Sequence, residues 1–378
     1  MQNSCMERKQ KALILKDLTK KIVFLVGPRQ VGKTWLAKNI AADVSNAVYL
    51  SYDHLEDRKI IKNEGWREST QLLILDEIHK MTGWKNYLKG LYDTKPEYLQ
   101  VIVTGSAGLD ILRQVGDSLA GRFFLHHLLP FSPAELQDTD FASDIERFIA
   151  RGGFPEPFLA SDPVDADRWR IQYVDSLLRF DAFEINQIDN VRNLQLVLEL
   201  LRSRVGSPVS YTSIAQDVGI SPNTVKKYIR ILEALYVVFR VTPFAKNIAR
   251  SLAKEPKLYF FDTGLVNGDN GAQLENLVAI CLLKHVYAKI DYAGQNYGLH
   301  YLKTKEGLEV DFALTKNGKI EQILEVKNRD SVPSKALLYF QKTYSLSAKQ
   351  LVRELRQESV YKNIEIIRVD GFLRSLFL

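Results

Sequence analysis

Gly27-Pro28-Arg29-Gln30-Val31-Gly32-Lys33-Thr34 is the stretch of this sequence that decides the fold. It matches the pattern G-x-x-x-x-G-K-[S/T] without exception, between the apolar run Ile22–Val26 and a helical segment at 35–44. Strand, glycine-rich loop and helix in this order make a phosphate cradle, because the glycines let backbone N–H groups turn inward and the helix N-terminus adds its positive dipole end. The stretch therefore predicts a nucleotide-binding loop in which Lys33 reaches the β- and γ-phosphates and Thr34 offers its hydroxyl to Mg²⁺.

A second motif completes the expected site. Four apolar residues, Leu72–Leu75, precede Asp76 and Glu77, and carboxylates after a buried strand lie where open α/β sheets bind ligands. We expect Asp76 to hold Mg²⁺, directly or through water, and Glu77 to polarise the water that attacks the γ-phosphate. Two acids after an apolar strand are common on their own, but their place after a complete phosphate-binding loop favours catalysis. The expected cofactors are ATP and Mg²⁺.

These motifs resemble those of the AAA-type ATPases, and the following sequence extends the resemblance. The segment VIVTGSAG (101–108) is similar to the strand that bears the first sensor residue near the γ-phosphate; Thr104 and Ser106 are the candidates, and Ser106 is favoured. The segment SLAGRF (118–123) has Arg122 where such ATPases carry an arginine finger, which stabilises transition-state charge from a neighbouring subunit. The alternative is a surface arginine in a turn. A finger that acts in trans implies a homo-oligomer.

The length and patterning of the chain predict several domains. Its 378 residues exceed one compact core. The first 130 residues alternate short apolar, β-branched runs with helical stretches, which predicts a parallel sheet with covering helices. We expect an α/β P-loop NTPase core over 1–130, a helical linker or lid over 131–200, a winged helix-turn-helix over 201–250 and a mixed α/β domain over 251–378.

Composition narrows the class of protein. A hydrophobic fraction of 46% and a charged fraction of 25% are typical of soluble globular proteins. No apolar run is as long as a membrane span, and the polar N-terminus does not resemble a signal peptide. The two cysteines, Cys5 and Cys281, indicate a reducing compartment without a disulfide framework. We expect a cytoplasmic protein with no membrane partner.

The segment Tyr211–Leu235 predicts a helix-turn-helix, followed by a candidate wing, YVVFRVTPF. Gly219 makes the turn, and Ser221 caps the second helix with Pro222 at its first position. Five polar side chains outside the apolar stripe of that helix are expected to meet DNA: Asn223, Thr224, Lys226, Lys227 and Arg230. Basic residues exceed acidic ones across 202–257, which fits polyanion binding. A solvated basic face and a module that packs against protein remain the alternatives.

Near the C-terminal end, acidic residues and a lysine lie on two strand-like runs, GLEVDFAL (307–314) and ILEVK (323–327), joined through an Asn-Gly turn. Asp311 lies on the first run, and Glu325 and Lys327 share one face of the second. Together with Glu275 on an expected helix at 272–288, the set resembles the restriction-endonuclease-like PD-(D/E)xK superfamily. The resemblance implies Asp311 and Glu325 as Mg²⁺ ligands, Lys327 orienting the nucleophilic water and Glu275 helping to hold the metal.

The full order of segments resembles a widespread group of bacterial and archaeal AAA-type ATP-binding proteins that end in a domain of unknown function. Phrases that carry this resemblance include GPRQVGKT, LLILDEIHK, LYFFDTGL and EVDF. The main hypothesis is an ATPase that couples nucleotide state to a DNA-engaging module, with metal-dependent DNA cleavage as an output. The alternative is an ATP-driven switch that grips a protein partner through a catalytically silent nuclease-like fold. A third, weaker hypothesis is a DNA-binding regulator that uses ATP as a sensor.

Overall fold

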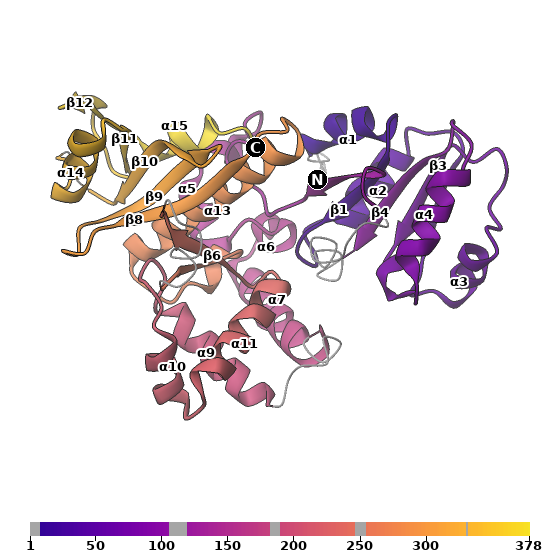
Figure 1. Cartoon of the computed structure of the whole chain (residues 1–378), viewed down its shortest axis with the longest axis horizontal. Helices are drawn as coiled ribbons and strands as arrows, with labels where there is room; N and C mark the ends of the chain where they lie inside the picture. Colours follow the sequence, from indigo (N-terminus) through magenta and orange to yellow (C-terminus); the bar gives the residue numbers. More distant parts are fainter. Residues whose placement is uncertain (1–7, 106–118, 182–189, 246–254, 330–331) are drawn as a thin grey trace. The chain divides into compact units, whose positions relative to one another are not determined.

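The computed structural model describes residues 8–105, 119–181, 190–245, 255–329 and 332–378 (Figure 1). The chain divides into two compact units, Met1–Leu129 and Pro130–Leu378. Among the described residues, no helix combines the length and the apolar character needed to cross a membrane.

The first unit is built on a five-stranded sheet in which all neighbouring strands are parallel. The strand order is β2 (Ala47–Ser51), β3 (Leu72–Asp76), β4 (Gln100–Gly105), β1 (Ile22–Val26) and β5 (Phe123–His127). β1 and β3 are buried along their whole length, as expected for strands covered on both faces. The predicted parallel sheet is therefore confirmed, and β1 lies between β4 and β5 within it.

Helices cover both faces of this sheet. One face packs alternate residues of β1 and β3 (Phe24 and Leu75, for example) against Leu88 of α4 and Ile61 of α3. α1 and α2 pack against β1, β3 and β4. The helical elements of the unit are α1 (Gln10–Leu18), α2 (Lys33–Ala41), α3 (Leu55–Lys62), η1 (Ile78–Lys80) and α4 (Trp84–Thr94).

The second unit begins with short helices and continues into a three-helix cluster. Its first elements are η3 (Asp140–Ser143), α5 (Ile145–Arg151), α6 (Pro155–Leu159), α7 (Pro163–Ser176) and η4 (Leu177–Asp181). The cluster consists of α9 (Val191–Arg202), α10 (Tyr211–Val218) and α11 (Pro222–Ala234). Gly219 ends α10 in the left-handed conformation, and the Ser221 side chain accepts the Thr224 N–H at the start of α11. The two predicted helices and their turn are confirmed.

An eight-stranded sheet forms the rest of the second unit, with the strand order β12-β13-β11-β10-β9-β8-β6-β7. β6, the candidate wing strand, pairs antiparallel with β7 and parallel with β8. It therefore lies in the same sheet as the C-terminal strands, and the expected boundary at residue 250 stays a prediction. The strands are β6 (Val238–Pro243), β7 (Lys257–Phe260), β8 (Tyr297–Lys303), β9 (Glu309–Lys316), β10 (Lys319–Lys327), β11 (Ser347–Val352), β12 (Ser359–Tyr361) and β13 (Ile364–Arg368).

The predicted hairpin joins β9 to β10. Lys316 pairs with Lys319, and the two residues between them, Asn317 and Gly318, both have positive φ, as a two-residue hairpin turn requires. Helix α13 packs against β7, β8 and β10, whereas α14 packs against β9, β10 and β11. The remaining helical elements are η5 (Thr263–Leu265), α13 (Asn270–Asp291), α14 (Lys335–Tyr344) and α15 (Val369–Arg374).

Candidate functional site

The loop Gly27–Thr34 lies between β1 and α2, and its two glycines are required for different reasons. At Gly27 a Cβ atom would stand 2.0 Å from the backbone oxygen of Leu128, so the close approach of two backbone segments excludes any side chain. At Gly32 a Cβ would have open space, but φ is +97°, a value that side-chain-bearing residues rarely adopt. Gly32 is the N-cap residue of α2, so this conformation turns the loop directly into the helix.

Lys33 folds back into this loop. Its side chain is buried, and Nζ donates hydrogen bonds to the backbone oxygens of Gly27 at 2.9 Å and Pro28 at 2.6 Å. The ammonium group is thus placed on the inner side of the loop at the N-terminus of α2, where the helix dipole and backbone N–H groups favour an anion. A phosphate bound there would meet a lysine that is already positioned.

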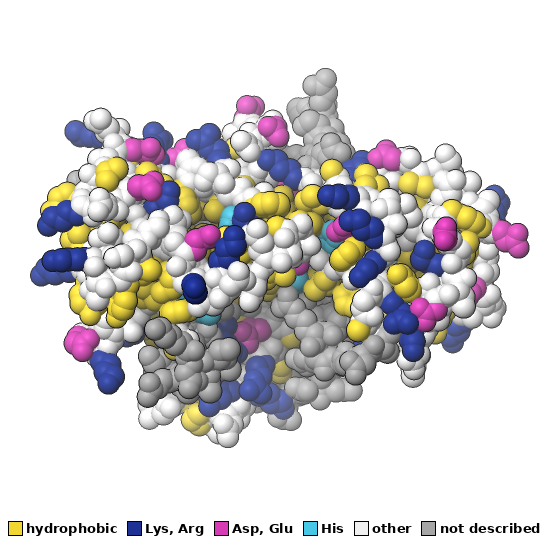
Figure 2. Space-filling model, turned by 45° about the horizontal axis from the view of Figure 1, so that its top comes forward, with side chains coloured by type: hydrophobic (Ala, Val, Ile, Leu, Met, Phe, Trp, Pro, Cys, Tyr) yellow, Lys and Arg dark blue, Asp and Glu magenta, His cyan; other side chains and the backbone are white. Residues whose placement is uncertain are grey.

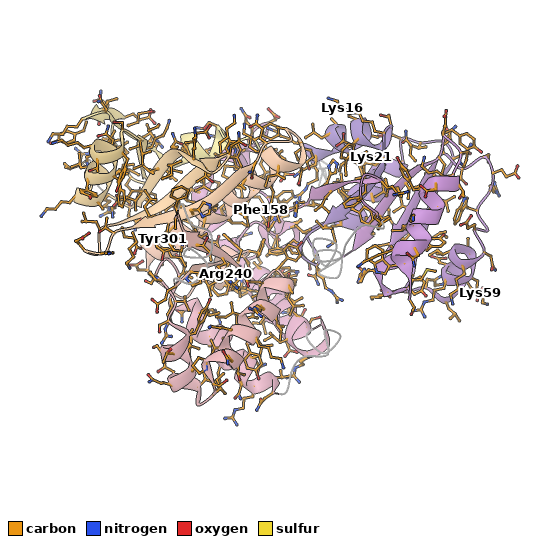
Figure 3. The ribbon with its side chains drawn as sticks, viewed as in Figure 1. Lys16, Lys21, Lys59, Phe158, Arg240 and Tyr301 are labelled. Atoms are coloured by element: carbon orange, nitrogen blue, oxygen red, sulfur yellow. The ribbon has the colours of Figure 1, made fainter. Side chains whose placement is uncertain are left out.

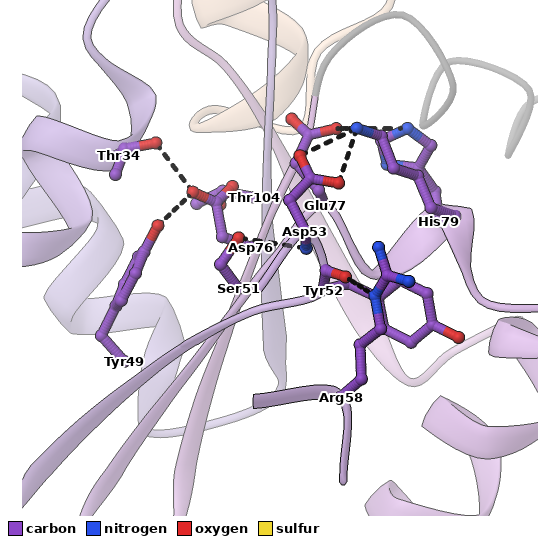
Figure 4. A network of polar contacts seen from close by, with 11 residues as sticks. Thr34, Tyr49, Ser51, Tyr52, Asp53, Arg58, Asp76, Glu77, His79 and Thr104 are labelled. Carbon is purple, nitrogen blue, oxygen red and sulfur yellow. Dashed lines mark hydrogen bonds and ion pairs between the residues drawn. The ribbon is translucent and has the colours of Figure 1, made fainter. Parts of the chain in front are cut away.

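Asp76, the last residue of β3, accepts hydrogen bonds from hydroxyl groups on three other elements (Figure 4). Its Oδ2 accepts hydrogen bonds from Thr34 Oγ1 at 3.0 Å and from the Tyr49 hydroxyl at 2.6 Å, and its Oδ1 accepts one from Thr104. Burial and the hydrogen bond to Asp76 raise the pKa of Tyr49 well above its usual value, so Tyr49 stays a donor. The phosphate-binding loop and the carboxylate are thereby joined directly.

The residues around Asp76 fit a magnesium ion. The Thr34 hydroxyl and the Asp76 carboxylate are neighbouring oxygen ligands, the kind of donor that Mg²⁺ prefers. Thr34 and Asp76 would hold the ion, and the ion would supply charge neutralisation for the phosphates.

Glu77 turns away from the strand direction with φ of 55° and reaches a partly buried position near η1. Its Oε2 lies 3.4 Å from His79 Nε2 and 3.9 Å from Lys80 Nζ. Burial raises the pKa of Glu77; Lys80 lowers it and Asp76 raises it. Oε2 is buried and makes no hydrogen bond among the described residues, so its contacts with His79 and Lys80 are ion-pair distances only. A carboxylate beside Asp76 whose pKa is raised by burial is the type of group that can polarise a water molecule.

Sequence reasoning missed two groups around these acids, Tyr49 and His79, and named Thr104 only as a sensor candidate. Tyr49 and Thr104 donate to Asp76, although Thr104 had been the less favoured of the two sensor candidates. Ser106, the favoured candidate, lies outside the described residues. His79 contacts Glu77, and burial and Lys80 lower its pKa to about 4, so its ring is neutral near pH 7. Tyr49 is the middle residue of β2, so its place in the chain gave no signal that its hydroxyl reaches Asp76.

Arg122 lies beside the N-terminal end of β1, whereas the phosphate-binding loop follows the C-terminal end of this strand. Its backbone oxygen accepts the N–H of Ile22, the first residue of β1, whereas the loop follows the last residue, Val26. Five strand residues separate the two ends by roughly 16 Å. The Arg122 guanidinium makes two hydrogen bonds to Asp93, at 2.9 and 3.1 Å. Arg122 is therefore remote from the phosphate-binding loop of its own chain, and an arginine finger remains a prediction for action in trans.

The expected DNA-facing residues lie along α11 with unequal exposure. Asn223, Lys226 and Arg230 are exposed, whereas Thr224 and Lys227 are partly buried. The Thr224 hydroxyl shares a 2.9 Å hydrogen bond with the capping Ser221. The exposed face of α11 therefore presents one amide and two cations.

Ion pairs reduce the basic excess between residues 202 and 257. Arg202 pairs with Glu199 and Arg204 with Asp217. Arg240, labelled in Figure 3, pairs with Glu233. In the coloured part of Figure 2, Lys and Arg side chains are spread over the visible face with Asp and Glu between them. The positive charge in this region that is outside these ion pairs and could meet a polyanion is concentrated on α11. Three further basic residues, Lys246, Arg250 and Lys254, lie outside the described residues.

The nuclease-like residues lie together but are paired with protein groups. Glu325 is buried, accepts a hydrogen bond from Ser334, and lies 3.0 Å from Lys327 Nζ. Asp311 Oδ2 accepts the N–H of Val326 at 2.9 Å, which ties β9 to β10. The predicted proximity of Asp311, Glu325 and Lys327 on adjoining strands thus agrees with the topology, while their role as a metal centre stays a prediction.

Glu275, on α13, belongs to a second group centred on a residue that sequence reasoning did not single out. Lys257 Nζ lies 2.8 Å from Glu309, 3.4 Å from Glu275 and 3.6 Å from Asp311. The Tyr259 hydroxyl donates to Glu275 at 2.6 Å. Burial and Asp311 raise the pKa of Glu275 to about 7, and Lys257 opposes the shift. Among the described residues, no set of three or more His, Cys, Asp or Glu side chains is arranged to hold a metal ion.

Family models match three consecutive parts of the chain. Residues 19–137 match an AAA domain. Residues 142–274 match a domain of unknown function, DUF8612, and residues 270–371 match another, DUF4143.

Two proteins with similar sequences are described as uncharacterized proteins. A protein of Mycobacterium tuberculosis is 26% identical over 269 residues, which make up 70% of this chain and 60% of that protein. A protein of Methanocaldococcus jannaschii is 24% identical over 352 residues, 82% of this chain and 76% of the relative. The match therefore spans 60% of the length of the mycobacterial relative.

Among solved structures, a Walker-type ATPase of Pyrococcus abyssi is similar with a TM-score of 0.46 and 13% identity, over 70% of this chain and 96% of that one. The chain combines an AAA-type P-loop ATPase domain, residues 19–137, with a C-terminal DUF4143 domain, residues 270–371.

Proposed function

We propose that this protein binds and hydrolyses ATP with Mg²⁺ and couples its nucleotide state to a DNA-engaging module in its second unit. The observation that carries the proposal is the link between Thr34 and Asp76, with Lys33 already inside the loop. In this assignment the residues of 27–34 bind the phosphates, Thr34 and Asp76 hold Mg²⁺, and Glu77 polarises the attacking water.

The DNA-engaging part of the proposal rests on α11. This helix is capped by Ser221, follows a tight turn and exposes Asn223, Lys226 and Arg230. These side chains are the amide and cationic groups that contact base edges and phosphates in DNA complexes. The antiparallel pair β6–β7 follows α11 in the chain, as a wing does in a winged helix. These features favour a winged helix-turn-helix over a solvated basic face.

DNA binding measured by fluorescence anisotropy tests this part directly. The variant N223A/K226A/R230A is compared with K335A/K342A, which removes two exposed lysines from α14. We expect the α11 variant to bind duplex DNA more weakly and to lose about two units of salt-dependence slope, because two phosphate-facing cations are gone. We also expect ATP to change the affinity of the unmutated protein. Equal loss in both variants, or none in either, would remove α11 as the DNA-binding element.

Two functions are possible for the C-terminal domain: metal-dependent DNA cleavage and binding of a protein partner. Metal-dependent cleavage assigns Asp311 and Glu325 to Mg²⁺ and Lys327 to the nucleophilic water, with Glu275 in support. A silent nuclease-like fold that grips a protein partner is favoured by one observation: Lys257 already neutralises carboxylates of this set. Plasmid and linear DNA incubated with Mg²⁺ or Mn²⁺, with and without ATP, distinguishes them. Cleavage that is lost in D311A and K327A establishes the nuclease; intact DNA beside active ATP hydrolysis favours the partner-binding switch.

A further inference from the structure

Lys257, on β7, lies at the centre of an acidic cluster formed by Glu275 of α13 and by Glu309 and Asp311 of β9. Its side chain is only 1% exposed, and three carboxylates from two other elements converge on its ammonium group. A buried lysine is costly unless it is paired and hydrogen-bonded. Its Nζ lies within 3.6 Å of an oxygen of each of the three carboxyl groups, which is the pairing that a buried ammonium group requires.

The acidic groups of this cluster outnumber the cations that contact them. Glu275, Glu309 and Asp311 supply three carboxyl groups, and Lys257 and Lys303 supply two ammonium groups, the second 2.9 Å from Glu309. Of these two lysines, Lys257 is buried and contacts all three carboxyl groups. Lys257 therefore supplies the positive charge that a metal ion supplies in an acid cluster of this kind.

The remaining lone pairs of the expected metal ligands also have donors. Glu275 accepts from Tyr259, Asp311 accepts from the Val326 N–H, and Glu325 accepts from Ser334 and lies beside Lys327. Lys257 Nζ also lies 5.5 Å from the centre of the Tyr301 ring, a cation–π contact. A metal ion would have to displace a buried, charged side chain and several hydrogen bonds at once. The residues present do not fit a divalent metal.

We propose that Lys257 is the resident cation of the Glu275–Glu309–Asp311 cluster and closes it to divalent metal ions. The cluster then fastens β7, β9 and α13 together without a metal, and the fold keeps acids typical of a nuclease while using them structurally. The inference does not rest on ATP hydrolysis, so its failure would leave the proposal for the first unit intact.

Binding of Mn²⁺ to the full chain without nucleotide tests the inference, with calorimetry and electron paramagnetic resonance as readouts. We expect the unmutated protein to lack a Mn²⁺ site that D311N removes. We expect K257M, which keeps the apolar stem and removes the charge, to bind one Mn²⁺ at least about tenfold more tightly, because the carboxylate oxygens that contact the Lys257 ammonium group become available to the ion. The double variant K257M/D311N should lose this gain.

The matched control is K303M, which removes the exposed partner of Glu309 and leaves Lys257 in place. It should not create the site. A Mn²⁺ site in the unmutated protein that disappears in D311N would overturn the inference, and so would a folded K257M with no gain. If K257M fails to fold by circular dichroism, the comparison of the unmutated protein with D311N decides the question alone.

Discussion

Replacing Lys33 by alanine should weaken ATP binding and leave the fold unchanged. The ammonium group now makes two hydrogen bonds to backbone oxygens of the loop, at 2.9 and 2.6 Å. On nucleotide binding these contacts are exchanged for contacts with fully charged phosphate oxygens. A hydrogen bond to a charged group contributes about 1.5–3 kcal/mol. Since about 1.4 kcal/mol corresponds to a factor of ten in affinity, K33A should bind ATP roughly 10- to 150-fold more weakly.

Isothermal titration calorimetry with ATP and Mg²⁺ measures this loss. The matched control is K59A, which removes an exposed lysine of α3 that is paired with Glu56 (Figure 3). We expect K59A to bind ATP like the unmutated protein and both variants to give the same circular dichroism spectrum. Unchanged ATP affinity in a folded K33A protein would refute the assignment of residues 27–34 as the phosphate-binding loop.

Three further predictions follow from single side chains. G27A should lose ATP binding, since the new Cβ would stand 2.0 Å from a backbone oxygen, whereas G90A on α4 meets open space and should bind normally; equal affinities in calorimetry would contradict the loop geometry. R122A should hydrolyse ATP poorly and recover when mixed with an E77Q subunit that keeps its arginine; no recovery in a steady-state assay would argue against a finger in trans. The pKa of His79 is lowered from 6.5 to about 4 in the folded protein, so the unfolded state binds more protons between these values and stability should fall as pH drops through that window. In thermal unfolding, H79Q should flatten this pH dependence by on the order of 3 kcal/mol, and an unchanged pH profile would count against a buried, neutral His79.

The first unit shows which parts of a site a sequence pattern can locate. The phosphate-binding loop and the Asp76–Glu77 pair each depend on a local strand and the residues after it, so their positions followed from contiguous residues. Tyr49 and Thr104 were not assigned to Asp76, because their contact depends on which strands become neighbours. β3 lies between β2 and β4, and this order brings both hydroxyl groups to the same carboxylate.

The second unit shows the same limit more strongly. The hairpin between β9 and β10 followed from alternation and an Asn-Gly turn, and it brought Asp311 near Glu325 as expected. Lys257 precedes these residues by more than fifty positions and had been counted only as part of a basic stretch. Its burial among acids depends on the pairing of β6 with β7 and on the packing of α13. Glu309 lies two residues before Asp311 on β9, and it was overlooked because its contact with Lys257 depends on the same pairing and packing.

ATP turnover by E77Q shows whether Glu77 polarises the attacking water. Glu77 directly follows Asp76, the carboxylate that would hold Mg²⁺, and burial raises its pKa. We expect E77Q to bind ATP with nearly unchanged affinity in calorimetry and to hydrolyse it at least about a hundredfold more slowly in a phosphate-release assay, because the amide cannot accept the water proton. Normal turnover in E77Q would contradict this role of Glu77 and assign the polarisation of water to another residue.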